Sequence, residues 1–306
     1  MKISDAVYTF LSYAEITKNQ SPKTLENYTR YLKLFLSFFG EDREIEAMTL
    51  ADIEQYRIFL YRREDKHGKR LAIKTQNYYL IAIRSLLKYL VRHDKDVMAP
   101  DKIELAKVAP RVVDFLNREE LERLFAAISL EKKIGRRDRA MIECLYSTGL
   151  RVSELCSLNR DQVDLIRKEF GVMGKGSKLR IVFLSDRATQ YISEYLKTRE
   201  DNYSPLFTSL SNRSKKIIDI TGKGEMFRMT RDAVEKIVQK YRKIAGIIKN
   251  VTPHTLRHTF ATEILRNGAD IRSVQEMLGH SSITTTQIYT HVTHGQLREI
   301  HKKFHK

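Results

Sequence analysis

The sequence predicts a mainly helical protein with a small β-sheet in its second half (an α+β class), divided into two domains. Apolar residues recur at helical spacing through the first hundred residues, and the spacing changes to every second residue near positions 170–184. A charged stretch between Pro100 and Pro110 is typical of an interdomain linker. The length of 306 residues is enough for two domains with separate cores.

Three helices are predicted in the first domain. Ser21 and Pro22 begin the first helix, because Pro is tolerated at an early position whose N–H has no helical partner, and the helix ends at Gly40. The second covers residues 49–63 and the third residues 73–91, each with apolar residues along one side. We expect these apolar stripes to pack together as an all-helical core.

The second domain is predicted to combine helices with a β-hairpin. Its strands, residues 171–173 and 179–184, flank a segment rich in Gly and Lys and show the period of two that is typical of strands. Thr252 and Pro253 mark the start of one helix, and Gly279 marks the end of another. The helices expected here cover residues 117–128, 137–147, 230–245, 252–266 and 270–278.

The chain is strongly basic, with 55 Lys and Arg against 38 Asp and Glu and a formal net charge of +17. Residues 1–110 contain 19 Lys and Arg against 15 Asp and Glu, so most of the excess lies in the second part. This excess favours a polyanionic partner, either nucleic acid or an acidic membrane surface. No apolar run approaches the roughly 18 residues that span a bilayer, and Asp5 lies where a signal peptide would begin its apolar stretch, so we expect a soluble, cytoplasmic protein.

His254 and Arg257 lie three residues apart at a predicted helix start, so both side chains are expected on one face. An imidazole and a guanidinium beside free backbone N–H groups suit a phosphate. A zinc site formed by His254 and His258 is the alternative. It lacks the intervening Glu of the His-Glu-x-x-His pattern, and no third ligand stands out.

Two further motifs place basic residues at chain turns. Arg151 opens a predicted helix just after the Gly149 stop, with Glu154 one turn later, although a surface Arg–Glu pair is the plainer interpretation. Lys175 lies at the tip of the predicted hairpin. A P-loop is excluded there, because Gly176 occupies the position after the lysine where Ser or Thr is needed. The similar Lys223 lacks flanking strands, so Lys175 is the better candidate.

The fourth motif contains His280, directly after Gly279, and Tyr289 nine residues further on. Taken alone, Tyr289 is one of 15 tyrosines and would be read as a packing residue. The full set, however, resembles the tyrosine recombinases, the integrase family that cuts and rejoins DNA through a phosphotyrosine. The residues that carry this resemblance, in the order and spacing of the family, are Arg151, Lys175, His254-x-x-Arg257, His280 and Tyr289.

The resemblance implies that Tyr289 is the nucleophile that attacks the scissile phosphate, while Arg151 and Arg257 hold its non-bridging oxygens. Elementary chemistry agrees with these roles. The transition state concentrates negative charge on oxygens, and arginine forks supply fixed bidentate donors for it. Tyrosine has an ordinary pKa of about 10, so attack near neutral pH needs a base or a cationic pocket.

The resemblance further implies that Lys175 is the general acid that protonates the departing 5′-oxygen. His254 would assist proton transfer at the nucleophile, and His280 would donate to the phosphate in the transition state. Glu154, in the family's Arg-x-x-Glu position, would orient neighbouring groups. No metal, cofactor or ATP is expected, since arginines stabilise the charge and the phosphotyrosyl bond retains the energy for rejoining.

The resemblance also implies a domain plan and partners. Residues 1–98 would form a helical core-binding (SAM-like) domain, 99–114 a linker, and 115–306 the catalytic domain with a short C-terminal tail. The two domains would clamp double-stranded DNA, and four protomers would exchange strands on two sites through a Holliday junction. A partner recombinase or a DNA translocase could take part. The resemblance further implies that the C-terminal tail docks on a neighbouring protomer. The alternative is that the tail is a frayed basic end.

We expect no extra N-terminal arm-binding domain, and on this ground the chain resembles Xer-like recombinases, which resolve chromosome or plasmid dimers. A nucleoid-associated protein is expected. A mobile-element integrase of the same family is the alternative within this class. A type IB topoisomerase and a non-catalytic DNA-binding regulator with this fold are alternatives outside it. A membrane-surface protein is disfavoured, because no amphipathic terminal helix is evident.

Overall fold

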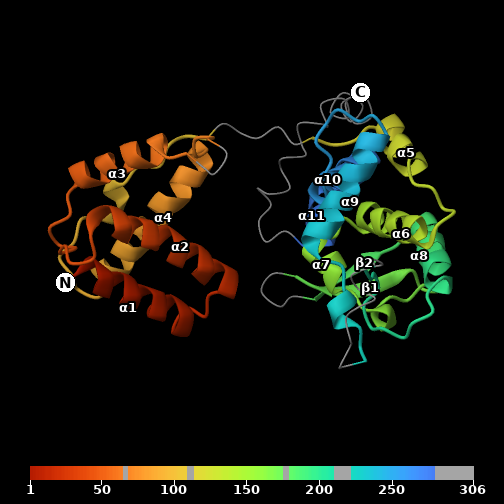
Figure 1. Cartoon of the computed structure of the whole chain (residues 1–306), viewed down its shortest axis with the longest axis horizontal. Coiled ribbons are helices and arrows are strands. Elements are labelled where there is room, and N and C mark those ends of the chain that lie inside the picture. The colour runs from red at the N-terminus through yellow and green to blue at the C-terminus, as the bar shows by residue number, and fades with distance from the viewer. Residues whose placement is uncertain (65–67, 109–113, 175–178, 210–221, 280–306) are drawn as a thin grey trace, which may run out of the picture. The chain divides into compact units, whose positions relative to one another are not determined.

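The computed structural model describes residues 1–64, 68–108, 114–174, 179–209 and 222–279. The chain divides into two compact units, Met1–Arg111 and Val112–Lys306 (Figure 1). The described part is mainly helical, with one two-stranded sheet in the second unit, as the sequence predicts. Among the described helices, none has both the length and the apolar character needed to cross a membrane.

Four helices build the first unit, namely α1 (Ile3–Ile16), α2 (Pro22–Phe39), α3 (Leu50–Arg62) and α4 (Ile73–Arg92). The three predicted helices are confirmed as α2, α3 and α4. The Ser21 and Thr49 side chains accept hydrogen bonds from N–H groups of the first turns of α2 and α3, which fixes where these helices begin. Helix α1 has no predicted counterpart, since Lys2 at its N-cap provides no capping side chain.

The first unit extends into the segment expected as a linker. Helices α1, α2 and α4 pack on one another, and Ile103 is fully buried in their core. The Asn77 side chain on α4 donates to the Ala106 carbonyl at 2.8 Å and accepts from its N–H at 3.2 Å. Residues 99–106 therefore pack on α4 instead of leaving the unit directly after it.

The second unit is built around α6 (Lys133–Thr148), which packs against α8 (Asp186–Lys197) and α10 (Pro253–Arg266). The predicted helices are confirmed, although α6 begins four residues earlier than expected. Helix α8 has no predicted counterpart, even though Ser185 caps it. The other helices of this unit are α5 (Arg118–Ala126), α7 (Val152–Ser157), α9 (Arg231–Ile244) and α11 (Ile271–Leu278).

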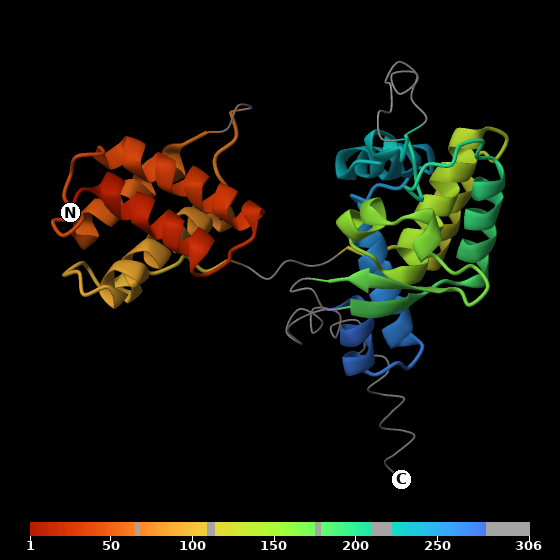
Figure 2. The same cartoon turned by 90° about the horizontal axis from the view of Figure 1, so that it is seen from below.

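The predicted hairpin is confirmed as β1 (Glu169–Met173) and β2 (Leu179–Phe183), which pair antiparallel with Val172 opposite Arg180. Strand β2 contacts α11, and Figure 2 shows the hairpin beside the blue helices of the unit. Helices α6 and α11 both end at glycines in the left-handed conformation, Gly149 (φ +61°) and Gly279 (φ +63°). These two helix ends, together with the start of α7, form the framework of the site described below.

Candidate active site

Arg257 links the ends of two helices. It lies on the second turn of α10, and its side chain is buried, with 3% of its surface exposed. Its Nη1 donates to the Gly149 carbonyl at 2.6 Å, and its Nη2 donates to the Leu278 carbonyl at 2.6 Å. Helix C-termini leave carbonyls without helical partners and carry partial negative charge, so the guanidinium is held by both hydrogen bonding and electrostatics.

Arg151 lies beside it, at the N-cap of α7. Its Nη1 donates to Glu154 Oε1 at 2.9 Å, and its Nη2 donates to the Gly279 carbonyl at 3.2 Å. The Leu278 carbonyl, which accepts from Arg257, and the Gly279 carbonyl, which accepts from Arg151, belong to adjacent residues. Both guanidiniums therefore lie at the C-terminal end of α11. Because 31% of the Arg151 side chain is exposed, it can still reach a ligand from solvent.

Glu154 anchors Arg151 from within α7. The Arg151 backbone N–H donates to Glu154 Oε2 at 2.8 Å, and the Arg180 guanidinium donates to both carboxylate oxygens. Burial by itself raises the pKa of Glu154, but the hydrogen bonds and charge of Arg180 and Arg151 outweigh it and lower the pKa below its ordinary value. Glu154 is therefore a buried carboxylate that stays ionised, and the surface-pair interpretation is wrong for it.

His254 is the second residue of α10, and its side chain is exposed, whereas that of Arg257 is buried. The predicted start of this helix is confirmed, since the Thr252 side chain accepts from the Thr255 N–H and Pro253 is the first helical residue. The described residues contain no group of three His, Cys, Asp or Glu side chains arranged to hold a metal ion. The zinc alternative thus gains no third ligand from this part of the chain.

Lys175, His280 and Tyr289 lie outside the described residues. Their chain neighbours are described. Lys175 belongs to the segment that joins β1 to β2, and His280 directly follows Gly279. The strands on either side of this segment pair antiparallel, whereas a P-loop follows a strand and precedes a helix.

Arg180 also contacts Glu154 and the end of α11, and no motif in the sequence indicates it. It lies on β2, with Leu179 and Ile181 exposed on the opposite face and Val182 buried two residues on. Side chains alternate between the faces of a strand, so a charged residue here shares the inward face with Val182. An inward-facing charge between outward-facing apolar residues is the signal that could have identified it.

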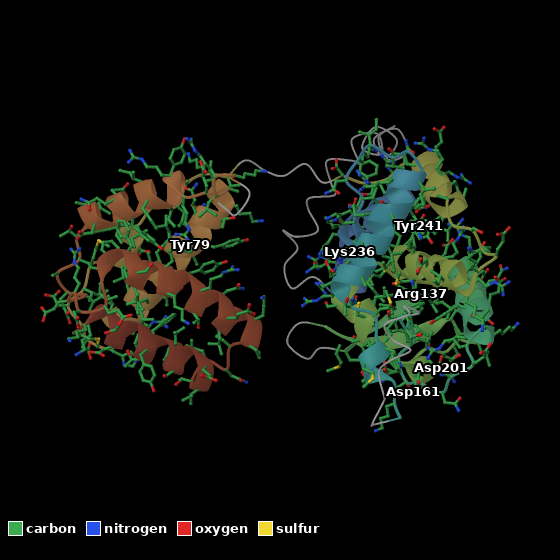
Figure 3. All side chains as sticks on the ribbon, in the orientation of Figure 1. Tyr79, Arg137, Asp161, Asp201, Lys236 and Tyr241 are labelled. Carbon is green, nitrogen blue, oxygen red and sulfur yellow. The ribbon has the colours of Figure 1, made fainter. Side chains whose placement is uncertain are left out.

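A second buried ionic group lies in the same unit but serves packing. The Arg137 guanidinium donates to Asp138 Oδ1 at 2.9 and 2.6 Å, and the Tyr241 hydroxyl donates to Asp138 Oδ2 at 2.9 Å. Arg137 and Tyr241 are labelled in Figure 3. These contacts connect α6 to α9. Arg137 also donates a hydrogen bond to the Thr208 carbonyl, so the charged groups of this cluster are used in holding the unit together.

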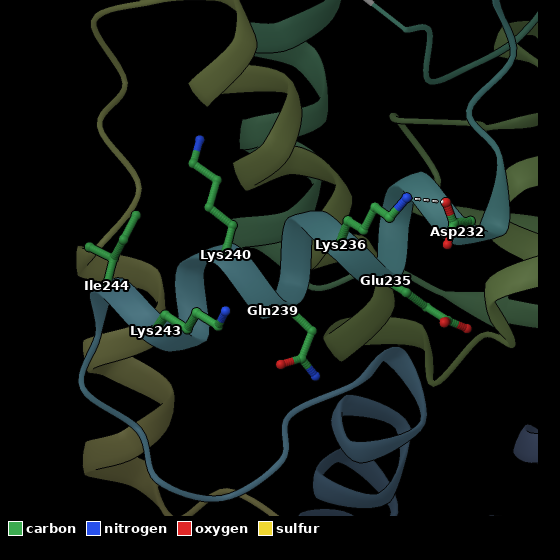
Figure 4. A pocket seen from close by; sticks show the side chains of 7 residues that line it. All are labelled: Asp232, Glu235, Lys236, Gln239, Lys240, Lys243 and Ile244. Carbon is green, nitrogen blue, oxygen red and sulfur yellow. Dashed lines mark ion pairs between the residues drawn. The ribbon is translucent and has the colours of Figure 1, made fainter. Parts of the chain in front are cut away.

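A shallow hollow lies along α9, and its charged lining consists of three lysines and the carboxylates of Asp232 and Glu235 (Figure 4). Lys236 is paired with Asp232 at 2.7 Å, and Lys240 and Lys243 extend from the same helix. Exposed ammonium groups of this kind suit sequence-independent contacts with phosphates. The hollow contains none of the expected site residues.

Comparisons with known proteins match both parts of the chain to one family. Residues 114–296 match the Phage integrase family, and residues 7–94 match the phage integrase N-terminal SAM-like domain. Tyrosine recombinase XerD of Listeria monocytogenes is 37% identical, covering 99% of both chains. Tyrosine recombinase XerC of Bacillus pumilus is 35% identical, covering 98% of this chain and 95% of the relative.

Solved structures show the same fold. The crystal structure of XerA recombinase matches over 99% of both chains, with 32% identity and a TM-score of 0.52. The Tn1549 transposon integrase in complex with transposon right end DNA matches over 100% of both chains, with 19% identity and a TM-score of 0.77.

The arginine pair on this fold, taken with these matches, defines the class of enzyme as a site-specific recombinase. The chain belongs to the phage integrase family. Within this family it is a tyrosine recombinase of the Xer type.

Proposed function

We propose that this enzyme cleaves and rejoins double-stranded DNA at a specific site through a covalent 3′-phosphotyrosyl intermediate on Tyr289. The observation that carries the proposal is the Arg151–Arg257 pair, held on the adjacent carbonyls of Leu278 and Gly279. Two guanidiniums fixed side by side supply donors for the two non-bridging oxygens of a phosphodiester. Their positions are set on folding, so the reaction does not have to reorganise them.

In the proposed step, Tyr289 Oη attacks phosphorus and the bond from phosphorus to the 5′-oxygen breaks. His254, which is exposed at the start of α10, accepts the phenolic proton. Lys175 gives its proton to the departing 5′-oxygen, and His280 donates to the phosphate. In the reverse step a 5′-hydroxyl attacks the phosphotyrosine, which restores the diester without ATP.

We assign core-site binding to residues 1–98 and catalysis to residues 115–306. Residues 99–114 connect them, and the first part of this connection, residues 99–106, packs on α4. The match of residues 7–94 to the SAM-like domain and the net charge of +17 support contacts with duplex phosphates from both parts. The proposed assembly is a homotetramer on two sites, which exchanges strands through a Holliday junction. A partner recombinase or a DNA translocase can complete it, and the enzyme would act at the nucleoid in the cytoplasm.

The biological role that we favour is resolution of chromosome or plasmid dimers, as in DNA recombination that supports chromosome segregation. The full-length similarity to proteins named XerD and XerC supports it. DNA integration by a mobile element is the second candidate, since the transposon integrase shares the fold. The position of the recombination site separates them, because a site within the end of an element would contradict the Xer role.

Covalent trapping tests the proposal. The enzyme is incubated without magnesium with nicked duplexes made from the encoding genome, and protein–DNA bands that resist SDS are sought. We expect a band for the wild type and for Tyr8→Phe, a control on a tyrosine that is 73% exposed on α1, and none for Tyr289→Phe. Sequencing the trapped DNA then gives the site.

Two outcomes contradict the proposal. Tight, specific DNA binding without an adduct would indicate a non-catalytic DNA-binding protein. Relaxation of any supercoiled plasmid without preference for a site would indicate a type IB topoisomerase.

A further inference from the structure

Three consecutive carbonyls at the end of α11 each accept a hydrogen bond from a different arginine. The carbonyls of Met277, Leu278 and Gly279 are held by Arg180, Arg257 and Arg151, in that order. The arginines come from β2, from α10 and from the start of α7. Arg151 and Arg257 belong to the site already proposed, and Arg180 has no role assigned in it.

The Arg180 guanidinium binds Glu154 through both of its terminal nitrogens. Its Nη1 donates to Oε1 at 3.0 Å, and its Nη2 donates to Oε2 at 2.7 Å. Arg151 supplies the other two bonds, Nη1 to Oε1 at 2.9 Å and the backbone N–H to Oε2 at 2.8 Å. A carboxylate has about four acceptor positions, so Glu154 is saturated, with two bonds on each oxygen. Its plane is therefore fixed from both sides.

Arg180 is placed to act through Glu154 and not on DNA. Its side chain is only 9% exposed, compared with 31% for Arg151. The Cδ and Nη1 atoms of Arg180 both lie 3.1 Å from the position that a Cβ on Gly279 would occupy, so the guanidinium packs against the glycine backbone. Its donors are directed to Glu154 and the Met277 carbonyl.

We propose that Arg180 is a positioning residue for cleavage, which orients Arg151 by locking the Glu154 carboxylate against the end of α11. The inference rests on the proposed phosphotyrosyl mechanism, because it concerns the arginine that would hold the scissile phosphate. Loss of Arg180 leaves one hydrogen bond on each Glu154 oxygen, so the carboxylate can rotate. The Arg151 guanidinium, which donates to Glu154 through Nη1, then changes its orientation as well. Displacement of a group at the reacting centre by about 1 Å costs about 100-fold in rate.

Lysine cannot replace this arginine. An ammonium group keeps the positive charge beside Glu154, but it lacks the planar fork that reaches both oxygens at once. Arg180→Lys is thus expected to keep the fold while losing the orientation. Arg180→Met removes the charge as well, at similar length.

The experiment measures the single-turnover rate of covalent adduct formation on the trapped duplex with saturating enzyme, and separately the affinity for the same duplex. For both Arg180→Lys and Arg180→Met we expect a rate that is about 10- to 100-fold lower and an affinity within about twofold of wild type. If Arg180 served packing alone, both variants would lose thermal stability, and the adduct rate would not fall while the DNA affinity stayed unchanged.

Arg199→Met is the matched control. The Arg199 side chain is 2% exposed and, like Arg180, its guanidinium donates to a carboxylate (Asp201) and to backbone carbonyls (Pro205 and Leu206). None of these acceptors belongs to the site. We expect Arg199→Met to lose thermal stability and to retain the adduct rate per folded molecule.

A double-mutant cycle tests whether Arg180 acts through Glu154. If it does, adding Arg180→Met to Glu154→Gln lowers the rate no further than the slower single variant does, since coupled residues are not additive. Multiplied losses would overturn the inference.

The wild type separates the two proposals. Absence of a Tyr289-dependent adduct in the wild type overturns the proposed function and this inference with it. A normal wild-type adduct together with a wild-type rate for Arg180→Lys overturns the inference alone, and this readout holds even if Arg180→Met does not fold.

Discussion

Gly149 ends α6, and its carbonyl accepts a hydrogen bond from Arg257. Replacing Gly149 with alanine should therefore disturb both the helix end and this hydrogen bond. Its φ of +61° lies in the left-handed region, where a side chain costs roughly 1–2 kcal/mol. A Cβ there would also lie 2.6 Å from Phe260 Cδ1 and 3.0 Å from Leu278 Cδ2, which is too close for carbon atoms. Overpacking of this kind costs about 1–3 kcal/mol, so we expect Gly149→Ala to destabilise the protein by about 2–5 kcal/mol in total.

Gly246→Ala is the matched control for this prediction. Gly246 has a similar φ of +65°, but a Cβ there would have no atom within 4 Å, so only the backbone cost of about 1–2 kcal/mol applies. For a unit of this size, 1 kcal/mol corresponds to about 2–4 °C in the unfolding midpoint. Thermal unfolding of the full chain, followed by circular dichroism, should therefore show a larger decrease for Gly149→Ala. Equal decreases would refute the steric argument.

Three further predictions concern single contacts. Asn77→Ala should lower the free energy of unfolding by about 1–3 kcal/mol, because the Ala106 N–H and carbonyl both lose their hydrogen-bond partner. Limited proteolysis should then cut faster within residues 99–108, and an unchanged cleavage rate would contradict this. Thr252→Ala should cost about 1 kcal/mol in urea unfolding through loss of the α10 cap, whereas Thr17→Ala, at a C-cap, should cost less. Glu154 has a lowered pKa when folded, so its ionised form contributes stability above the unfolded pKa of about 4.3 that is lost as the pH falls through the folded value. The stability deficit of Glu154→Gln at pH 7 should accordingly shrink below about pH 4 in urea titrations, and a constant deficit would contradict the assignment.

The sequence predicts the elements whose start and stop signals are local. Ser21, Thr49 and Thr252 cap helices where expected, and Gly149 and Gly279 end them. These signals depend on the conformations of a few neighbouring residues, so they can be recognised without knowledge of the fold.

Features that depend on distant partners were not predictable in the same way. Residues 99–106 look like a polar linker, and only the core of the first unit shows that Ile103 is buried. Likewise, Arg151 and Glu154 form a local pair in the sequence. The third member, Arg180, lies 26 residues from Glu154 in the sequence and meets it where β2 packs beside the end of α11.

The end of α11 explains how so much positive charge can be held in one place. Arg151, Arg180 and Arg257 carry three positive charges, and the Glu154 carboxylate contacts two of them, Arg151 and Arg180. Carbonyls at helix ends, which carry only partial negative charge, accept hydrogen bonds from all three guanidiniums. Carbonyls fix the direction of a guanidinium without neutralising it, whereas a second carboxylate would compete with the ligand. The arrangement therefore keeps a net positive charge in a fixed geometry, which is what a phosphodiester needs when its oxygens gain charge in the transition state.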